Sequence, residues 1–428
     1  MSGTFRLDRS NVAREIGFGR KGLDAVIQRG CWTAFILLCI CLSSLNGRVP
    51  VFGGELAFRH FVIDTELVGR NFGQTAVADL TGDGRPEFVL GNWDGVLQAY
   101  QCESPAQWKR FVIGKASKND VGLASFDVDQ DGWVDLVSGG VWYRNPGRLT
   151  ETFGEVVFDP NISNVHDIAI ADMDGDEKPD IVMMSDRHNL RWYRIPEDCR
   201  QPWPKFDIGP AVHAGLAVGD LDHDGDTDVV RTDVWFENLN GKGTQWGQRK
   251  IGPNTPPPPD FQPKFAFNAT KAAVVDLNKD GWNDIVFTDA EIPGGKVWWM
   301  ENQDGKGTAW RRHEVFNPRK GEPRRGAFHS LAVQDFNGDG HLDIFTAEME
   351  AVRGESNPRW YIWIQLDGQG LQWQEHVILD ANLGGHEAKV ADFTGDGKLD
   401  IISKPWNAHP KNALGGKPFV VFLENISR

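Results

Sequence analysis

The sequence is poor in cysteine, in positive charge and in long apolar runs. Only Cys102 and Cys199 lie beyond residue 47, which excludes a disulfide-rich scaffold; the two can form one disulfide or stay as buried thiols. The formal net charge of −15 argues against nucleic acid as a partner, because nucleic-acid binding requires a basic surface. No stretch has the periodicity of an amphipathic helix, which favours an all-β chain.

The one long apolar run lies near the N-terminus, at residues 32–45, after a basic segment and before Gly47. It is short for a membrane span and has the length of the apolar region of a signal peptide. We predict a signal peptide over residues 1–47, with an uncleaved anchor as the alternative. The mature chain would have no transmembrane segment unless the signal is uncleaved. Export implies an extracellular or periplasmic location, where the protein could associate with the cell surface.

An acidic segment of nine residues occurs seven times along the chain. In the copy at residues 335–343, side chains with oxygen atoms stand at positions 1, 3, 5 and 9, and a glycine stands at position 6. Ca²⁺ takes about six to eight oxygen ligands, and glycine permits the positive φ of a tight loop. The first residues of successive copies are 45 to 59 residues apart, a period typical of repeat arrays and propellers.

This pattern predicts up to seven structural calcium ions. Two copies depart from it, since the third has Glu177 in place of the glycine and the first ends in Glu87. The predicted ligands, loop by loop, are Asp79, Thr81, Asp83 and Glu87; Asp127, Asp129, Asp131 and Asp135; Asp172, Asp174, Asp176 and Asp180; Asp220, Asp222, Asp224 and Asp228; Asp276, Asn278, Asp280 and Asp284; Asp335, Asn337, Asp339 and Asp343; Asp392, Thr394, Asp396 and Asp400.

Each repeat contains four β-forming stretches in the same order. An alternating stretch comes first, a small apolar one runs into the acidic loop, a third begins at the last acid of the loop, and the fourth is aromatic. Four strands in each of seven repeats predict an all-β fold, a seven-bladed β-propeller over residues 55–428. The chain ends after a fourth stretch and begins, at residues 58–63, with an unpaired first stretch. In the alternative, an open array of repeats, the N-terminal and C-terminal stretches would each be an unpaired sheet edge. We therefore expect a closed ring in which the N-terminal strand completes the last blade.

The residues that precede the inner strands are rich in histidine. His166, His213, His329 and His386 occupy equivalent places in four repeats. Because the acidic loops join the two inner strands of each blade, these residues should lie on the opposite face, around the axis of the ring. A histidine at a strand entry can also simply hydrogen-bond to a neighbouring blade, and histidines from separate blades could converge on a transition metal.

We predict a functional mouth at this place. The candidate catalytic residues are His166, His213, His329, His386, Lys389 and Lys271, and the candidate substrate-binding residues are Arg231, Lys404, Trp406, Asn92, Trp93, Arg187 and Glu387.

The segment at residues 336–344 and its six relatives resemble the FG-GAP or VCBS repeat, which is found in integrin α-subunit heads and in many secreted bacterial proteins. The resemblance covers about residues 57–425. It implies a calcium-binding propeller with metal in the loop between the inner strands. It does not imply one function, since similar propellers include adhesion modules and polysaccharide lyases.

Two functions stay open. Cationic residues at the mouth of an acidic protein predict an anionic ligand such as an acidic glycan. A polysaccharide lyase would use a histidine or Lys389 as the base, with Arg231, Lys271 or Lys404 neutralising a uronate carboxylate. The alternative is a non-catalytic, calcium-dependent adhesion or protein-interaction module that binds a cell-surface or protein ligand.

Overall fold

The computed structural model describes residues 56–185, 188–251, 270–292, 294–316, 325–350 and 357–427. All of the described residues belong to one compact unit, Phe52–Arg428. The predicted signal peptide at residues 1–47 and the candidate Arg187 lie outside the described residues. Within the described ranges, no helix is long and apolar enough to cross a membrane.

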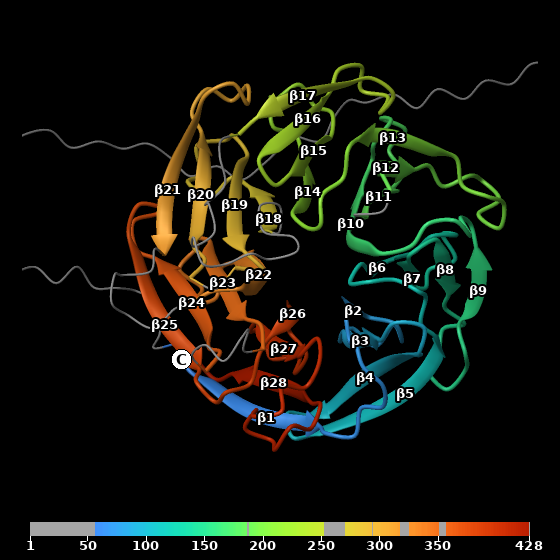
Figure 1. The fold of residues 1–428 in the computed structure, drawn as a ribbon, viewed down its shortest axis with the longest axis vertical. Coiled ribbons are helices and arrows are strands. Elements are labelled where there is room, and N and C mark those ends of the chain that lie inside the picture. Colours follow the sequence, from blue (N-terminus) through green and yellow to red (C-terminus); the bar gives the residue numbers. More distant parts are fainter. Residues whose placement is uncertain are drawn as a thin grey trace, which may run out of the picture. The chain divides into compact units, whose positions relative to one another are not determined.

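Seven four-stranded antiparallel sheets form the blades, and Figure 1 shows them arranged in a ring. Blade 1 consists of β2 (Gln74–Ala78), β3 (Glu87–Gly91), β4 (Val96–Ser104) and β5 (Gln107–Lys115); blade 2 of β6 (Ala124–Phe126), β7 (Asp135–Ser138), β8 (Val141–Arg144) and β9 (Gly154–Val157); blade 3 of β10 (Val165–Ala171), β11 (Asp180–Ser185), β12 (Leu190–Tyr193) and β13 (Lys205–Gly209); blade 4 of β14 (Leu216–Gly219), β15 (Asp228–Arg231), β16 (Val234–Asn238) and β17 (Trp246–Lys250).

Blade 5 consists of β18 (Thr270–Val275), β19 (Asp284–Asp289), β20 (Val297–Asn302) and β21 (Trp310–Phe316); blade 6 of β22 (Phe328–Gln334), β23 (Asp343–Glu348), β24 (Trp360–Gln365) and β25 (Trp373–Leu379); blade 7 of β26 (His386–Ala391), β27 (Asp400–Lys404), β28 (Val420–Asn425) and β1 (Phe58–Asp64). The predicted all-β propeller with seven blades is confirmed.

The N-terminal strand closes the ring. β1 pairs antiparallel with β28, with Phe58 opposite Asn425 and Phe61 opposite Phe422. The first strand of each blade contacts the first strand of the next, and β2 of blade 1 contacts β26 of blade 7. The predicted completion of the last blade by the N-terminal strand is therefore confirmed.

The hydrophobic cores lie between neighbouring blades. Phe287 and Trp298 of blade 5 pack with Trp235 of blade 4, and Phe422 of blade 7 packs with Phe88 of blade 1. Trp235 is fully buried, as are tryptophans in the third strands of several other blades. Most of these aromatic side chains therefore stabilise the ring and are not available to a ligand.

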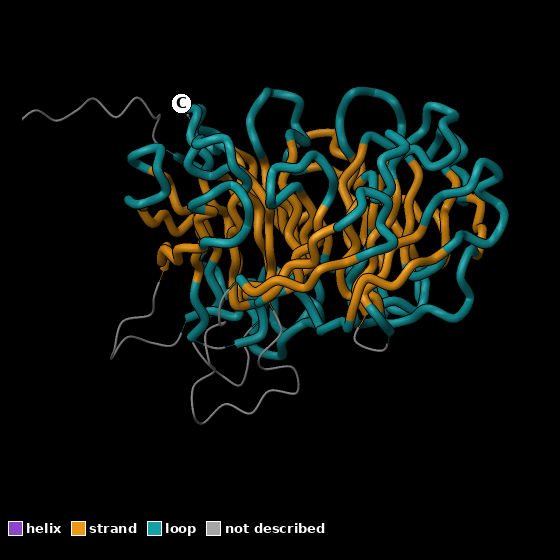
Figure 2. The backbone as a smooth tube through the Cα atoms, turned by 90° about the horizontal axis from the view of Figure 1, so that it is seen from above, coloured by secondary structure: helices purple, strands orange, loops and turns teal. Residues whose placement is uncertain are grey.

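The two faces of the ring carry different segments of the repeats. Figure 2 shows the strands as a layer between two sets of loops. The acidic loops join the first to the second strand of each blade, so all of them lie on one face. The segments that lead into the first strands lie on the opposite face, as the sequence predicts.

Candidate functional site

The seven acidic loops share one conformation. In blade 6, the Asp335 carboxylate accepts the backbone N–H groups of Gly338 at 2.7 Å and Gly340 at 2.8 Å. In all seven loops the N–H of position 6 donates to the first aspartate in this way. The first carboxylate thus folds each loop around itself and keeps its remaining lone pairs for a cation.

The third loop keeps this conformation without its glycine. Glu177 stands at position 6 with φ of 65°, in the left-handed region that glycine adopts at least cost. Its N–H still donates to Asp172 at 2.8 Å. Glu177 therefore adopts a strained backbone conformation, and the third loop keeps the geometry of the other six.

The acid at position 9 anchors each loop to its blade through hydrogen bonds. In blade 6, buried Asp343 accepts the N–H of Phe336 at 3.0 Å and the N–H of Gln365, on the third strand, at 3.0 Å. In blade 1, Glu87 takes the same part through Leu80, so the longer side chain replaces aspartate. Burial, helped by the neighbouring carboxylates of the loop, raises the pKa of Asp343 to about 7 although its two backbone hydrogen bonds oppose the shift.

Three loops bring carboxylate oxygens within 4.8 Å of one another, and each has Asp at position 3: Asp127, Asp129 and Asp135; Asp172, Asp174 and Asp180; Asp220, Asp222 and Asp228. The other four loops have Thr or Asn at this position. Within the described residues, one buried oxygen at position 3 has no hydrogen-bond partner in four loops, those of Asp129, Asp174, Asp222 and Thr394. An unpaired buried oxygen is costly, and a hard cation would satisfy it, so the residues fit Ca²⁺.

Arginines already pair with two of these loops. Arg144 lies 2.6 Å from Asp129 and also contacts Asp131, and Arg194 contacts Asp174. The blade 4 loop instead holds a dense set of carboxylates, and burial together with Asp224 raises the pKa of Asp222 to about 6. This loop therefore has the strongest electrostatic need for a cation.

On the opposite face, the histidines converge. His213 lies 4.4 Å from His166 between ring centroids, His166 lies 5.5 Å from His329, and His329 stacks on His386 at 3.8 Å. The ring of His386 in turn lies 5.4 Å from that of Trp406. The four histidines thus form a continuous row across the mouth, contributed by blades 3, 4, 6 and 7.

β-Bulges at the entries of the inner strands place three of these histidines. The pairing register shifts around His166 in β10, around His329 in β22, and between His386 and Lys389 in β26. A bulge leaves an extra residue in one strand and changes the direction of its side chain.

The row of histidines lines a cavity of about 210 Å³, with Asp120, Val121, His166, His213, Glu291, His329, Met349, His386 and Trp406 in its wall. Gly73 lies against this wall, where a Cβ would stand 2.1 Å from the carbonyl oxygen of Asp120 and 2.4 Å from the ring of Trp406. Only glycine allows this approach.

Asp120 and Glu291 are not among the candidate catalytic or substrate-binding residues, although the sequence places both on this face of the ring. Asp120 precedes the first residue of its acidic loop, Asp127, by seven positions, as His213 precedes Asp220. Glu291 lies in a loop of the same face, and the sequence does not show that it contacts His329.

Beneath the cavity, three charged residues join across the axis. Lys271 of blade 5 lies 3.1 Å from Asp167 of blade 3 and also contacts Glu387 of blade 7. Lys389 lies 3.8 Å from the same Glu387. The backbone of Glu387 has φ of 57°, a conformation that L residues rarely adopt and that packing must hold. We call Asp167, Lys271 and Glu387 the axial ion triad.

The described part of the mouth does not carry the free positive charge that the sequence suggests. His329 lies 3.0 Å from Glu291 and 3.2 Å from Glu387. Burial disfavours its charge, but the two carboxylates outweigh burial and raise the pKa of His329 to about 9. Like Lys271 and Lys389, this cation is therefore already paired.

His386 differs from its stacked neighbour. Burial, followed by the charges of His329 and Lys404, holds the pKa of His386 well below its usual value. The Lys404 amine lies 3.4 Å from Nδ1 of His386, and burial lowers the pKa of Lys404 to about 7 although Glu387 and Glu350 oppose the shift. A neutral and a cationic imidazole thus lie face to face.

Three other candidates do not line the cavity. Arg231 donates to the carbonyl of Pro210 at 2.6 Å and lies over the ring of Phe236, away from the mouth. Asn92 accepts the N–H of Val96 and so holds its own turn. Trp93 is half-buried and is not part of the cavity wall.

The comparison with family models decides the family. A model of the FG-GAP-like repeat matches residues 127–183, 172–230, 276–346 and 335–403, together more than half of the chain. The protein belongs to the FG-GAP-like repeat family. No curated protein is similar enough in sequence to match it.

Solved structures resemble this FG-GAP-like propeller in fold. Crystal structures of BBS1N in complex with ARL6DN, soaked with lead and with mercury, have TM-scores of 0.51 and 0.50 and identities of 11% and 10%. They cover 86% and 88% of this chain and 97% and 99% of theirs. An Agrocybe aegerita lectin described as recognising non-reducing terminal N-acetylglucosamine has a TM-score of 0.48 and 18% identity, over 77% of this chain and 91% of its own. At identities of 11% and 10%, the likeness to the BBS1N structures shows the fold alone.

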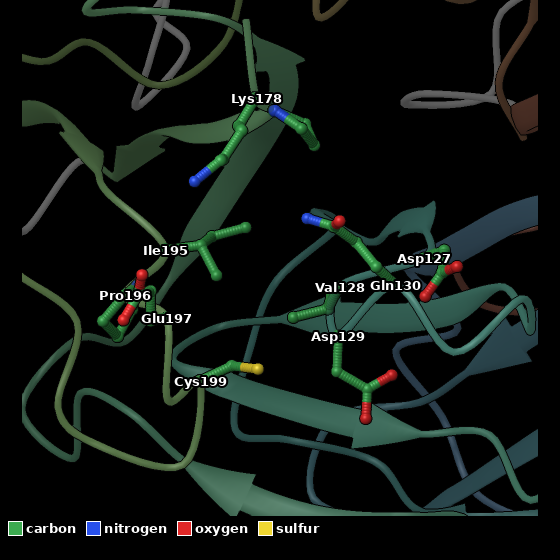
Figure 3. A pocket seen from close by; sticks show the side chains of 10 residues that line it. Asp127, Val128, Asp129, Gln130, Lys178, Ile195, Pro196, Glu197 and Cys199 are labelled. Atoms are coloured by element: carbon green, nitrogen blue, oxygen red, sulfur yellow. The ribbon is translucent and has the colours of Figure 1, made fainter. Parts of the chain in front are cut away.

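A second cavity of the FG-GAP-like propeller, of about 300 Å³, adjoins the acidic loop of blade 2. Figure 3 shows Lys178 of blade 3 and Asp129 of blade 2 on opposite sides of it, with Cys199 nearby. Cys102 and Cys199 are both buried free thiols, which decides between the two alternatives for these cysteines. Because Asp129 is a predicted metal ligand, we assign this cavity to the acidic loop of blade 2.

The axial ion triad should stabilise the ring strongly. Lys271→Met leaves Asp167 and Glu387, whose side chains are only 11% and 12% exposed, without their shared cation, and breaking a buried ion pair costs about 3–5 kcal/mol. Denaturant unfolding should show this loss, whereas Lys250→Met, at an exposed position of β17, should change stability little. Adding Glu387→Gln to Lys271→Met should recover part of the loss. Equal stability of Lys271→Met and Lys250→Met would contradict the role of the triad.

Proposed function

We propose that this FG-GAP-like propeller acts outside the cytoplasm and binds one residue of an acidic carbohydrate in its histidine-lined mouth, with calcium ions supporting the opposite face. The observation that carries the proposal is the cavity itself, lined by four imidazoles, an indole and two carboxylates. Its volume of about 210 Å³ lies below the roughly 300–1,000 Å³ of pockets for drug-sized ligands, which suits a single sugar residue.

The chemistry of the wall supports a sugar. The ring of Trp406 offers an apolar face to the C–H groups of a pyranose, and the imidazoles and Glu291 offer hydrogen-bond donors and acceptors to its hydroxyl groups. The described cations of the mouth already have partners. The carboxylate of an acidic ligand would therefore have to replace Glu291 as the partner of His329, or His386 as the partner of Lys404. A neutral oligosaccharide is therefore the informative comparison.

A second candidate, a polysaccharide lyase, is favoured by the stacked pair His329 and His386. Environments that push the pKa values of two adjacent groups apart are typical of an acid and a base. In a β-elimination, neutral His386 would take the proton on the carbon next to the uronate carboxylate. The electron pair forms a carbon–carbon double bond as the glycosidic C–O bond breaks, and a protonated group returns a proton to the leaving oxygen. His329, which is cationic at neutral pH, would neutralise the carboxylate or supply that proton.

His386→Ala separates the two functions. Purified protein is titrated calorimetrically with acidic and neutral oligosaccharides, and the ultraviolet absorbance of unsaturated uronate is followed on acidic polysaccharides. A binder should show a graded loss of affinity, whereas a lyase should lose about 10²- to 10⁴-fold in rate. Lys389→Ala, which removes a cation from Glu387, should have the same direction of effect.

The control is His60→Ala, at an exposed position of β1. His60→Ala should melt like the parent protein in calcium, and a cooperative calcium-dependent melt shows that His386→Ala and Lys389→Ala are folded. If no carbohydrate binds, or if His386→Ala binds every ligand as the parent does, the mouth is not a carbohydrate site. A protein ligand that needs the same face would instead support the interaction-module alternative.

A further inference from the structure

Three residues at one side of the mouth have the composition of a transition-metal site. Asp120 precedes β6, His166 opens β10 and His213 precedes β14, so each comes from a different blade. One ligand atom of each residue lies within 4.8 Å of the others. We propose that Asp120, His166 and His213 bind a divalent transition-metal ion such as Zn²⁺.

The ligand types distinguish this site from the acidic loops. Ca²⁺ takes oxygen ligands only, whereas imidazole nitrogen suits Zn²⁺ and other first-row transition metals. Two histidines and one carboxylate are three protein ligands, which leaves a coordination position open in a tetrahedral ion. The two kinds of site lie on opposite faces of the ring, so each can be loaded separately.

Outer groups already orient one of the ligands. Nδ1 of His166 lies 2.9 Å from the Asp167 carboxylate, which can only accept a hydrogen bond. The proton of neutral His166 therefore belongs on Nδ1, and the lone pair belongs on Nε2, the atom that a metal would take. A carboxylate behind a histidine ligand is the usual arrangement in metal sites, where it fixes the tautomer and the ring orientation.

The same carboxylate connects His166 to the segment of His213. Asp167 accepts the backbone N–H groups of Gly215 at 2.6 Å and Leu216 at 3.1 Å, just after His213 in the chain. Asp167 thus orients His166 and fixes the backbone just after His213, and it is itself paired with Lys271. Such preorganisation is what a built site requires, since ligands on separate blades could otherwise not keep their spacing.

The open side of the site faces the cavity. Asp120, His166 and His213 form one part of its wall, and His329 and His386 form another. A bound ion would therefore add a cation that is not already paired, where an incoming carboxylate or hydroxyl could complete its coordination. The ion would bind whether or not a carbohydrate does, so this inference goes beyond the proposed function.

The test uses Zn²⁺ and Co²⁺ alone, with untagged protein stripped by chelator and then kept in excess Ca²⁺ to occupy the acidic loops. Calorimetry should show one equivalent of Zn²⁺, and Co²⁺ should give the visible absorption of an ion with nitrogen ligands. His213→Ala and Asp120→Ala should each weaken binding by more than about 100-fold, because even outer groups contribute about 10- to 100-fold. Asp167→Asn should fall in that smaller range.

His60→Ala serves as the matched histidine control and should bind Zn²⁺ like the parent. A calcium-dependent melt shows whether each variant is folded, and Asp120→Asn replaces Asp120→Ala if the latter is not. Absence of a stoichiometric Zn²⁺ site in the parent would overturn the inference, as would a site that survives the double variant of Asp120 and His213. Neither outcome bears on carbohydrate binding, which is measured without added transition metal.

Discussion

Calcium chelation should lower the melting temperature of this propeller by roughly 10–25 °C, depending on how many loops are loaded. A site at a calcium concentration of 100 times its Kd contributes about 2.7 kcal/mol. In a domain of this size, 1 kcal/mol moves the melting temperature by about 1–2 °C. If calcium occupies only the three loops with Asp at position 3, the expected decrease is about 10 °C, and if it occupies all seven loops, the expected decrease is about 25 °C.

The loops are linked around the ring, which should make the loss cooperative. The backbone N–H of Asn302 donates to Asp284 of its own blade at 2.9 Å, while its side-chain amide donates to the carbonyl of Leu221 in the loop of blade 4 at 2.9 Å. Asn145 and Asn238 make the same two kinds of contact in blades 2 and 4. A loop that loosens without its ion therefore also weakens a contact of its neighbour.

The variant Asp222→Ala tests whether calcium binds, because its effect on the melting temperature should depend on whether calcium is present. In calcium the variant should melt below the parent because it lacks a ligand. In chelator it should melt no lower than the parent, because burial and like charges already disfavour a charged Asp222 there. Glu155→Ala, at an exposed position of β9, should behave as the parent in both solutions. Identical melts of the parent with calcium and with chelator would show that the loops are not metal sites.

The pH dependence follows from the acids at position 9. Their pKa values are raised above those of the unfolded chain, to about 6 for Asp135 and about 8 for Asp228, with burial as the main cause. An acid with a raised pKa in the folded state stabilises the fold when protonated, so stability is lost as the pH rises through that value. In chelator, the melting temperature should fall between about pH 4, near the pKa of the unfolded chain, and about pH 8. Bound calcium favours the charged forms and should reduce this fall.

The fold could be predicted from the sequence because its signals are local and repeated. Oxygen ligands and glycine at fixed positions define each loop, and the stretches on both sides alternate as strands do. Even Glu177, the clearest departure, adopts the backbone conformation of the glycine that it replaces. The unpaired first strand could be placed as well, since a ring has only one position for it.

The mouth could be predicted only in part. Counting back from the loops places His166, His329 and His386 around the axis, as observed. The charge balance could not be read in this way, because the partners Glu291 and Glu387 reach His329 through a loop and through a bulge with an unusual φ. Bulges interrupt the alternation of strand residues, so register alone does not show which side chains meet across the ring.

Removal of the strand β1 should abolish cooperative folding, although a segment next to a predicted signal peptide is ordinarily dispensable. β1 is the outer strand of blade 7, and without it β28 has an unpaired edge. The deletion also removes Phe61, which stacks on Phe422 with ring centroids 6.3 Å apart, and exposes the core between blades 7 and 1. A chain that lacks residues 56–66 should aggregate or show no cooperative thermal transition.

A permuted chain distinguishes loss of the strand from loss of its position in the sequence. Phe58 lies opposite Asn425, and the N–H of Ile426 donates to the carbonyl of Ala57 at 2.9 Å, so a short turn can join the end of β28 to the start of β1. A protein that begins before β2 and carries residues 57–66 after its C-terminal residues should therefore fold and melt cooperatively in calcium. The same permutant with the appended strand scrambled should behave like the deletion. A soluble, cooperatively melting deletion variant would show that the ring does not depend on β1. The exposed edge of β28 and the opened core would then reduce the stability of the fold only slightly.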